Sequence, residues 1–374
     1  MPGFVNAHTH LYSALARGMP GPGEPPRTFT EILEKVWWRL DRALDEECVQ
    51  LSGLVGAIEA ARSGTTVLFD HHASPSFVRG SLATLRRAVE EVGLRSVLCY
   101  ETTDRNGLAG RDAGIAENRA FLASGPMPLT RGMVGAHANF TLGDESLDLL
   151  AAAAGTGSGV HVHVAEDRCD VEESRARGTG VVERLRGHGL VGERTLLVHC
   201  VHLTAEELRD AQDAGASLVH CPRSNTNNAV GRAPTAHFRR AALGTDGLDE
   251  DMWAEARAAF LGMRDAGRSD ALAATVLMLA EGHRLAGRFF GLPLGRLDAG
   301  APADLVVLDY RPPTPLTADN LAGHLLFGLD RSHVRSTMVA GRFVLRDRRI
   351  VGVDEEAVFA RARRAAEALW GRMR

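Results

Sequence analysis

Fifteen histidines occur in this chain, and ten of them stand in or directly after short runs of β-forming, apolar residues (His8, His10, His71, His72, His137, His161, His163, His199, His202 and His220). His8 and His10 are two residues apart in one run, so both rings point to the same face of a strand. His163 and Asp246 end two later runs. Neutral imidazole and carboxylate oxygen are ligands that suit zinc or ferrous iron. Three histidines and one aspartate with room for a water indicate a catalytic metal site, not a structural one.

The elements that must bring these residues together alternate between strands and helices. Short β-rich runs predict strands at residues 3–7, 66–70, 95–100, 131–136, 160–165, 195–198, 217–220 and 242–245. Helical patterns lie at residues 30–62, 81–91, 144–154, 171–188 and 205–214. Eight β-then-α units in about 250 residues are typical of a TIM-like (β/α)8 barrel, an α/β fold whose strand ends meet at one mouth. A doubly wound sheet would need a glycine-rich phosphate loop after the first strand, and the sequence has none there.

The last part of the chain has a different pattern. Residues 303–309 and 334–345 read as β-strands, the second interrupted by Ala340 and Gly341, and prolines separate the two. Residues 355–373 show the spacing of a charged, amphipathic helix. We predict a barrel over residues 1–293, a small β-sandwich appendage over 294–352 and a C-terminal helix over 353–374.

Composition disfavours several classes of function. A net charge of −4 and a pI near 6.4 leave no basic footprint for nucleic acid or a membrane surface. No apolar run approaches the roughly 20 residues that span a bilayer, and the five cysteines form no C-x-x-C pair. Lys35 is the single lysine and stands far from any glycine-rich loop, which disfavours Schiff-base and P-loop chemistry. We expect a cytoplasmic enzyme with a small-molecule substrate.

Several motifs, in order along the chain, resemble the amidohydrolase superfamily. PGFVNAHTHL resembles its first-strand signature, HVHVAED the fifth-strand H-x-x-E of its deaminase branch, and HCVHL, HCPRSN and LGTDG its last three strand ends. GRLDAGAPADLVVLD resembles the return into the small β-sandwich of that superfamily. WWRLD, TTVLFDHHASP and HCPRSNTNNAVGRAP are most similar to the SsnA group of aminohydrolases, which is related to chlorohydrolases and to guanine and adenosine-type deaminases. The resemblance covers nearly the whole chain.

The resemblance implies a metal-dependent hydrolase with a single divalent ion, zinc or alternatively Fe2+, held by His8, His10, His163 and Asp246. Superfamily members with two metals bridge them through a carboxylated lysine at the fourth strand end, where this chain has His137. Glu101, at the third strand end, stays open. An acid there binds metal in some relatives, but a substrate contact or a helix cap fits equally well.

Three residues are expected to carry the reaction. A bound Zn²⁺ lowers the pKa of its water to about 7. Asp246 would accept a proton from that water, and His199 would hydrogen-bond the water or the forming oxyanion. Glu166, three residues beyond His163, would protonate a ring nitrogen and then the departing amine, which leaves poorly unless protonated. The expected reaction is hydrolysis of a non-peptide carbon–nitrogen bond, the deamination of a purine-, pyrimidine- or triazine-like ring.

Substrate contacts are predicted at His137 and Asn225, on the fourth and seventh strands, and at His72 after the second strand. Alternation along that strand allows only one of His71 and His72 to point inward. The alternative to a substrate contact at these loop positions is the capping of turns.

Adenosine-type deaminases of the superfamily carry an acid after the first helix that grips the sugar. Alignment of KVWWRLDR puts Leu40 at that position with Asp41 adjacent, which disfavours a nucleoside substrate. Two further alternatives are chloride release from a triazine-like ring and a metal-binding pseudoenzyme. Glu166 favours an amine over chloride as the leaving group, and the complete ligand set disfavours a pseudoenzyme.

Met1 stands only two residues before the first predicted strand. Relatives carry several dozen residues before this point, which pair with the C-terminal strands of the small domain. We therefore expect the natural protein to extend upstream of Met1, with a barrel site that does not depend on the extension. Association of identical chains is left open.

Overall fold

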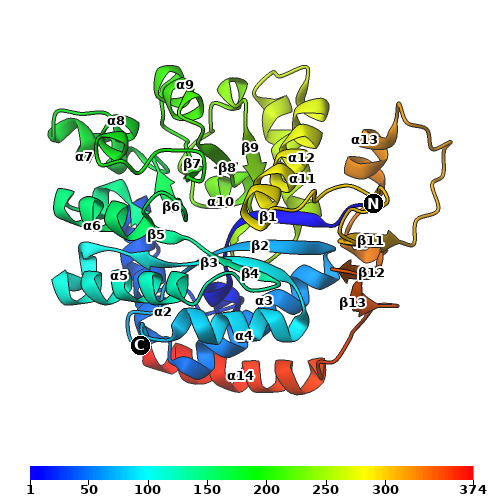
Figure 1. The fold of residues 1–374 in the computed structure, drawn as a ribbon, viewed down its shortest axis with the longest axis horizontal. Helices are drawn as coiled ribbons and strands as arrows, with labels where there is room; N and C mark the ends of the chain where they lie inside the picture. The colour runs from blue at the N-terminus through cyan, green and yellow to red at the C-terminus, as the bar shows by residue number, and fades with distance from the viewer. Residues whose placement is uncertain (374) are drawn as a thin grey trace.

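Ten strand segments form a closed parallel barrel in the computed structural model, which describes residues 1–373 (Figure 1). They are β1 (Phe4–His10), β2 (Thr65–His72), β3 (Arg95–Thr102), β4 (Thr130–Gly132), β5 (Val134–Ala138), β6 (Val160–Val164), β7 (Leu196–His199), β8 (Ser217–His220), β9 (Ala241–Leu243) and β10 (Asp246–Gly247). β10 pairs with β1 and closes the circle. Because β4 with β5 forms the fourth barrel strand and β9 with β10 the eighth, the predicted (β/α)8 barrel is confirmed.

The barrel interior below the mouth is apolar. Alternate residues of the strands, such as Val5 and Ala7 of β1, pack into one buried cluster. Phe289 and Phe290, at the end of α12 (Ala271–Phe290), belong to the same cluster and fill the bottom of the barrel. These strands read as continuous apolar runs because both of their faces are buried.

Helices surround the barrel and connect its strands. They are α3 (Glu46–Arg62), α4 (Ser81–Val92), α5 (Gly107–Ala123), α6 (Asp144–Ala154), α7 (Arg168–Ala176), α8 (Val181–Gly187), α9 (Ala205–Asp213), α10 (Pro222–Asn227), α11 (Met252–Asp265) and α12. The helical pattern at residues 171–188 corresponds to two helices, α7 and α8. Gly178 takes a φ of +78°, which ends α7, and α8 starts at a new N-cap, Gly180.

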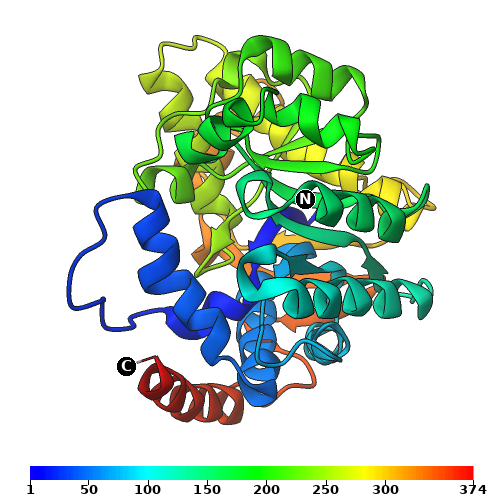
Figure 2. The ribbon, with the colours of Figure 1, turned by 90° about the vertical axis from the view of Figure 1, so that its left-hand side faces the viewer.

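The helical pattern at residues 30–62 is also divided, because three consecutive helical pieces precede α3. They are α1 (Phe29–Ile32), the π-helical turn η2 (Leu33–Trp37) and α2 (Trp38–Ala43). Leu44 is extended, and the side chain of Asp45 then caps α3 by accepting the backbone N–H of Cys48. Figure 2 shows this N-terminal segment projecting beside the barrel.

A four-stranded antiparallel sheet follows the barrel, formed by β11 (Leu305–Leu308), β12 (Val334–Val339), β13 (Arg342–Arg346) and β14 (Arg349–Ile350). Figure 1 shows it beside the N-terminus, and Pro2 makes a bridge to Leu305. A bidentate ion pair ties it to the barrel: Arg95, at the start of β3, donates to Asp304 from Nε at 2.6 Å and from Nη2 at 3.2 Å. Both side chains are buried.

The C-terminal helix α14 (Glu355–Arg372) agrees with the predicted amphipathic pattern and runs below α3 and α4 (Figure 1). Leu369 is fully buried on its inner face, and the indole N–H of Trp370 donates to the backbone oxygen of Leu15 at 2.9 Å. Among residues 1–373, no helix combines the length and apolar character needed to cross a membrane.

Candidate active site

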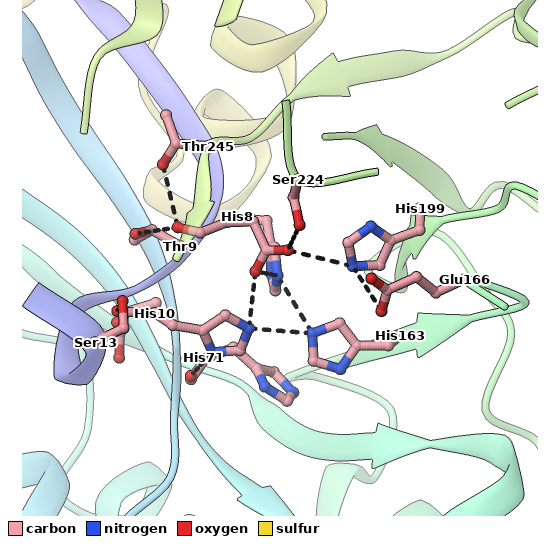
Figure 3. A network of polar contacts seen from close by, with 12 residues as sticks. His8, Thr9, His10, Ser13, His71, His163, Glu166, His199, Ser224 and Thr245 are labelled. Carbon is pink, nitrogen blue, oxygen red and sulfur yellow. Dashed lines mark hydrogen bonds and ion pairs between the residues drawn. The ribbon is translucent and has the colours of Figure 1, made fainter. Parts of the chain in front are cut away.

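Four side chains from three strands converge at the mouth of the barrel, where the rings of His8, His10 and His163 face one another (Figure 3). The Nε2 atom of His163 lies 3.2 Å from that of His10 and 3.3 Å from that of His8. Oδ1 of Asp246 lies 3.4 Å from His8 Nε2 and 3.2 Å from His10 Nε2. Donors that bind one ion tetrahedrally at about 2.0–2.1 Å are roughly 3.3–3.4 Å apart. The four predicted ligands therefore fit a single divalent ion without rearrangement.

The backbone fixes which nitrogen of the imidazoles faces the centre. Nδ1 of His10 lies 2.6 Å from the carbonyl oxygen of His71, and Nδ1 of His163 lies 2.7 Å from that of His137. A carbonyl oxygen only accepts, so each Nδ1 carries the proton and donates. Both Nε2 lone pairs are left for a metal, as in other metal-binding histidines.

The third ligand is held by another histidine. Nδ1 of His8 lies 2.9 Å from Nε2 of His161, and both rings are buried. Burial lowers the pKa of His8 to about 3, so the ring is neutral, as a metal ligand requires. No role is predicted for His161 from the sequence, although its position two residues before His163 puts it on the same face of β6.

The two carboxylate oxygens of Asp246 have different partners. Burial acts against its charge, but contacts with His10 and His8 hold the pKa of Asp246 well below its usual range. Oδ1 faces the imidazoles, whereas Oδ2 accepts a hydrogen bond from the hydroxyl of Ser224 at 2.5 Å. Ser224 is a contact that the sequence did not indicate.

Glu166 and His199 face Oδ2 of Asp246 from the neighbouring strand ends. Nε2 of His199 lies 3.4 Å from Glu166 Oε2 and 3.8 Å from Asp246 Oδ2. Asn228 donates to Glu166 Oε1 at 3.2 Å. Burial raises the pKa of Glu166, because a charged carboxylate is costly there. The three predicted catalytic residues are thus brought together.

The backbone at these strand ends is unusual. Five non-glycine residues there have a positive φ: Ala165 (45°), His199 (70°), Cys200 (53°), Asp246 (62°) and Leu248 (81°). Such left-handed conformations cost about 1–3 kcal/mol each and collect at functional sites. The mouth of the barrel is therefore locally strained.

A cavity of about 300 Å³ opens at the site and is lined by three of the four donors, His10, His163 and Asp246, whereas His8 is fully buried. One wall is apolar and comes from the segment α1–η2–α2 and the loop after β5: Phe29, Leu33, Trp37, Trp38 and Phe140. Asp41, Glu101 and His137 add polar groups to the lining. This combination of an apolar wall and a few polar groups is typical of a small-molecule site.

The three predicted substrate contacts have different positions. His137 lines the cavity, with Nδ1 2.7 Å from the hydroxyl of Thr141. Asn225 does not line it; its Oδ1 lies 2.8 Å from Nδ1 of His199 and orients that ring. His72 is buried outside the cavity lining, with Nε2 2.8 Å from the hydroxyl of Ser74. The expected substrate contacts of His72 and Asn225 therefore have no support in the geometry.

His71 is the member of the pair that faces the ligand cluster. Its ring centre lies 4.7 Å from that of His163. Nε2 lies 3.1 Å from the carbonyl oxygen of Ala136, and Nδ1 lies 3.3 Å from Glu101 Oε2. His71 thus contacts the ligand His10 through its backbone oxygen and Glu101 through its ring, and it does not line the cavity.

Asp41 of α2, and not the adjacent Leu40, is the side chain that reaches the cavity. Leu40 is packed in the hydrophobic core, whereas Asp41 lines the cavity. The carboxylate of Asp41 pairs with Arg105, which also lies 3.3 Å from Glu101 Oε1 and sits 5.0 Å above the ring of Trp38. Burial raises the pKa of Asp41 to about 6, against the opposing charge of Arg105. Leu40, the residue that the sequence alignment places here, therefore does not reach the cavity, whereas the adjacent Asp41 does.

Known proteins share both the sequence pattern and the fold. The profile of the amidohydrolase family matches residues 1–344. A 5-methylthioadenosine/S-adenosylhomocysteine deaminase from Moorella thermoacetica is 33% identical over 376 residues, which cover 96% of this chain and 85% of that protein. A 5'-deoxyadenosine deaminase from Methanosarcina mazei is 30% identical, over 100% of this chain and 87% of that protein.

Solved structures of related proteins share the fold of this chain. An adenosine deaminase from Xanthomonas campestris with bound zinc superposes with a TM-score of 0.85 at 27% identity, over 99% of this chain and 85% of that one. A zinc-containing atrazine chlorohydrolase from Arthrobacter aurescens shares the fold, with a TM-score of 0.81 at 21% identity over 98% of this chain and 88% of that one. The chain belongs to the amidohydrolase family and is a metal-dependent hydrolase of non-peptide carbon–nitrogen bonds.

Proposed function

We propose that this chain is an aminohydrolase that removes the exocyclic amino group from the aminopurine ring of an adenosine-like nucleoside. The observation that carries the proposal is the carboxyl group of Glu166 beside the four-donor site, with its side chain 12% exposed and Oε2 3.4 Å from His199 Nε2. A deaminase needs such a proton donor, because an amine leaves poorly unless it is protonated. The relatives named for adenosine derivatives support the same chemistry in this chain.

We further propose one zinc ion per chain, held by Nε2 of His8, His10 and His163 and by Oδ1 of Asp246. Neutral imidazoles with one carboxylate are a donor set that suits zinc, and zinc is present in the Xanthomonas deaminase. When bound, zinc lowers the pKa of a water to about 7 and so supplies a nucleophile at neutral pH.

The residues of the chain divide the proton transfers between them. Oδ2 of Asp246 is turned away from the other ligands and accepts the first proton, with Ser224 donating to it. His199 presents Nε2, a buried atom without a hydrogen-bond partner, toward the same space, because Nδ1 is held by Asn225. Nδ1 carries the proton of the ring, so Nε2 has a free lone pair and can accept a hydrogen bond from the hydroxyl on the attacked carbon. A buried polar atom without a hydrogen-bond partner calls for an explanation, and a polar ligand that contacts Nε2 of His199 would supply the missing partner.

Glu166 supplies the proton that the substrate ring takes up. Asn228 donates to Oε1, so Oε2 is the oxygen that carries and transfers the proton. Its raised pKa keeps a fraction of the group protonated near neutral pH. Glu166 gives this proton to a ring nitrogen, which keeps it. The proton that Asp246 accepted from the water passes to the amino group, which leaves as ammonia, and the hydroxyl proton on the attacked carbon returns to Glu166 as the carbonyl group forms.

The cavity lining favours a sugar next to the ring. Asp41 and Glu101 are acceptors for hydroxyl groups, and Arg105 between them neutralises part of their charge. The aromatic faces of Trp38 and Phe140 add apolar surface for the remainder of the substrate. The sequence alignment disfavours a nucleoside because Leu40 cannot bind a sugar hydroxyl. Asp41 and Glu101 supply the acceptors that Leu40 lacks.

Zinc-loaded protein incubated with a panel of substrates tests the proposal. Ammonia release should be fastest with adenosine, 5'-deoxyadenosine or 5'-methylthioadenosine, slower with adenine, and negligible with cytidine. A chlorinated triazine serves as the competing substrate, with chloride measured in the same samples. Chloride release without ammonia release from any aminopurine would make the chain a dehalogenase, and metal binding without either reaction would make it a pseudoenzyme.

A further inference from the structure

A second polar cluster lies behind β1, and the reaction described above does not use it; Asn6, Thr9 and Glu250 of this cluster do not line the cavity, whereas Thr245 does. Glu250 stands in the loop between β10 and α11 and is 4% exposed. Its Oε1 lies 2.7 Å from the hydroxyl of Thr9, and its Oε2 accepts from Asn6 Nδ2 at 2.7 Å. The hydroxyl of Thr9 also lies 3.1 Å from the backbone oxygen of Asp246. Asn6 makes a second donation, to the hydroxyl of Thr245 at 2.7 Å.

Counting protons settles the direction of these bonds. The hydroxyl of Thr9 has one proton but faces two oxygens, Oε1 of Glu250 and the carbonyl of Asp246, which only accepts. If Glu250 carries a proton on Oε1, it donates to Thr9 and leaves the proton of Thr9 for Asp246. Both protons of the Asn6 amide are used as well, on Oε2 and on Thr245. With the carboxyl group protonated, each contact has one proton, as a buried network requires.

We infer that Glu250 is a protonated carboxylic acid and a positioning residue, which fixes the backbone of Asp246 through the hydroxyl of Thr9. Asp246 has a φ of +62°, and Thr245 also approaches its carbonyl oxygen, at 3.4 Å. Holding this carbonyl sets the direction of the side chain, with Oδ1 toward His8 and His10. The inference rests on the proposed metal site but not on the proposed substrate.

The surroundings of Glu250 favour the neutral acid. Burial raises the pKa of Glu250 to about 8, with Asp70 of β2 and Glu59 of α3 adding to the effect, while the bonds from Thr9 and Asn6 oppose it. Arg17 pairs with Glu59, and within residues 1–373 no cationic side chain contacts Glu250 itself. A buried carboxylate without a cation is costly.

Three variants separate the role of the proton from that of the side chain. Glu250→Gln keeps every contact, because its amide donates to Thr9 and its oxygen accepts from Asn6. Glu250→Leu removes both. Glu117→Gln is the matched control: Glu117 is a buried carboxyl group that accepts the N–H groups of Gly80 and Leu82, on α5 and away from the mouth.

Zn²⁺ affinity of the metal-stripped proteins, measured against a chromophoric chelator, is the first readout. Glu250→Gln and Glu117→Gln should bind within about threefold of the parent protein, whereas Glu250→Leu should lose about 10–100-fold, the scale of a lost outer contact of a metal ligand. If Glu250→Leu does not fold, Thr9→Val takes its place, since it removes the hydroxyl that joins Glu250 to the backbone of Asp246 and leaves Glu250 itself in place. Parent-like affinity in the variant that folds overturns the positioning role.

The melting temperature of metal-free protein across pH is the second readout. A buried acid whose pKa is raised in the folded state loses stability as pH rises from its unfolded pKa toward its folded one. Glutamine has no proton to lose, so the difference between Glu250→Gln and the parent should grow in favour of the variant from about pH 5 to about pH 8. A difference that does not change with pH overturns the protonated state. Neither readout uses turnover, so absence of deaminase activity would refute the proposed function and leave this inference standing.

Discussion

Glu166→Gln removes a single proton donor and keeps the shape of the side chain. The glutamine oxygen can accept the bond that Asn228 gives to Oε1 at 3.2 Å. The amide N–H group then takes the place of Oε2, 3.4 Å from Nε2 of His199. Nδ1 of His199 lies against Oδ1 of Asn225, so Nδ1 donates and Nε2 is free to accept from this amide. Both contacts of Glu166 survive, and the variant should fold normally.

What the variant loses is the transfer of a proton to the substrate. General acid catalysis contributes about 10²–10⁴-fold, which corresponds to about 2.7–5.4 kcal/mol of activation free energy at 1.36 kcal/mol per tenfold. We therefore expect kcat to fall by at least about 10²-fold, with the metal retained because Glu166 is not among the four donors. Glu172→Gln, on the exposed face of the following helix, is the control and should keep parent activity.

The pH dependence of kcat adds a second check. The raised pKa of Glu166 means that the acid keeps its proton into the neutral range, so kcat of the parent should fall as pH rises above that pKa. This alkaline decline should be absent from the residual activity of Glu166→Gln. Ammonia release and elemental analysis on the same samples decide the matter. Unchanged kcat removes Glu166 from the reaction, and loss of zinc would make it a ligand.

Four further predictions follow from the same geometry. Elemental analysis should find close to one zinc per active chain, and a value near two would contradict the single-ion site. Asp246→Asn should lower both zinc content and kcat, whereas full metal content with full turnover would remove Asp246 from both roles. Asp304→Asn leaves Arg95 buried without its carboxylate and should cost about 3–5 kcal/mol of unfolding free energy, measured by urea denaturation against Asp298→Asn in an exposed ion pair, which should cost at most about 1 kcal/mol. Asp41→Asn should raise KM for adenosine but not for adenine, and equal effects on both would show that Asp41 does not contact the sugar.

The ligands were predictable because each signal is local. His8 and His10 share one strand, and the alternation of side chains in a strand brings both rings to one place. His163 and Asp246 end strands whose apolar runs are short and well delimited. A barrel brings such strand ends together whatever lies between them, so no long-range knowledge was needed.

The residues that were missed depend on features that a linear pattern does not carry. The π-helical turn at Leu33–Trp37 changes the number of residues per turn just before Leu40 and Asp41, and the sequence motif alone does not show that Asp41 is the one that lines the cavity. Alternation gives no means of choosing between His71 and His72. The contacts of Glu250 with Asn6 and Thr9 join residues more than 240 positions apart, and closure of the barrel alone brings them together.

The five left-handed residues at the mouth limit which substitutions this protein can accept. At about 1–3 kcal/mol each, they consume an amount of free energy comparable with the whole net stability of an ordinary domain. Relaxing one of them, for instance by glycine at position 200, would make the fold more robust but release the strand ends that aim the catalytic groups. The opposite end of the barrel is closed by Phe289, Phe290 and the Arg95–Asp304 pair and does not position catalytic groups. Laboratory evolution for higher stability should therefore select substitutions near the closed end of the barrel. Selection for activity on new substrates should favour substitutions near the mouth.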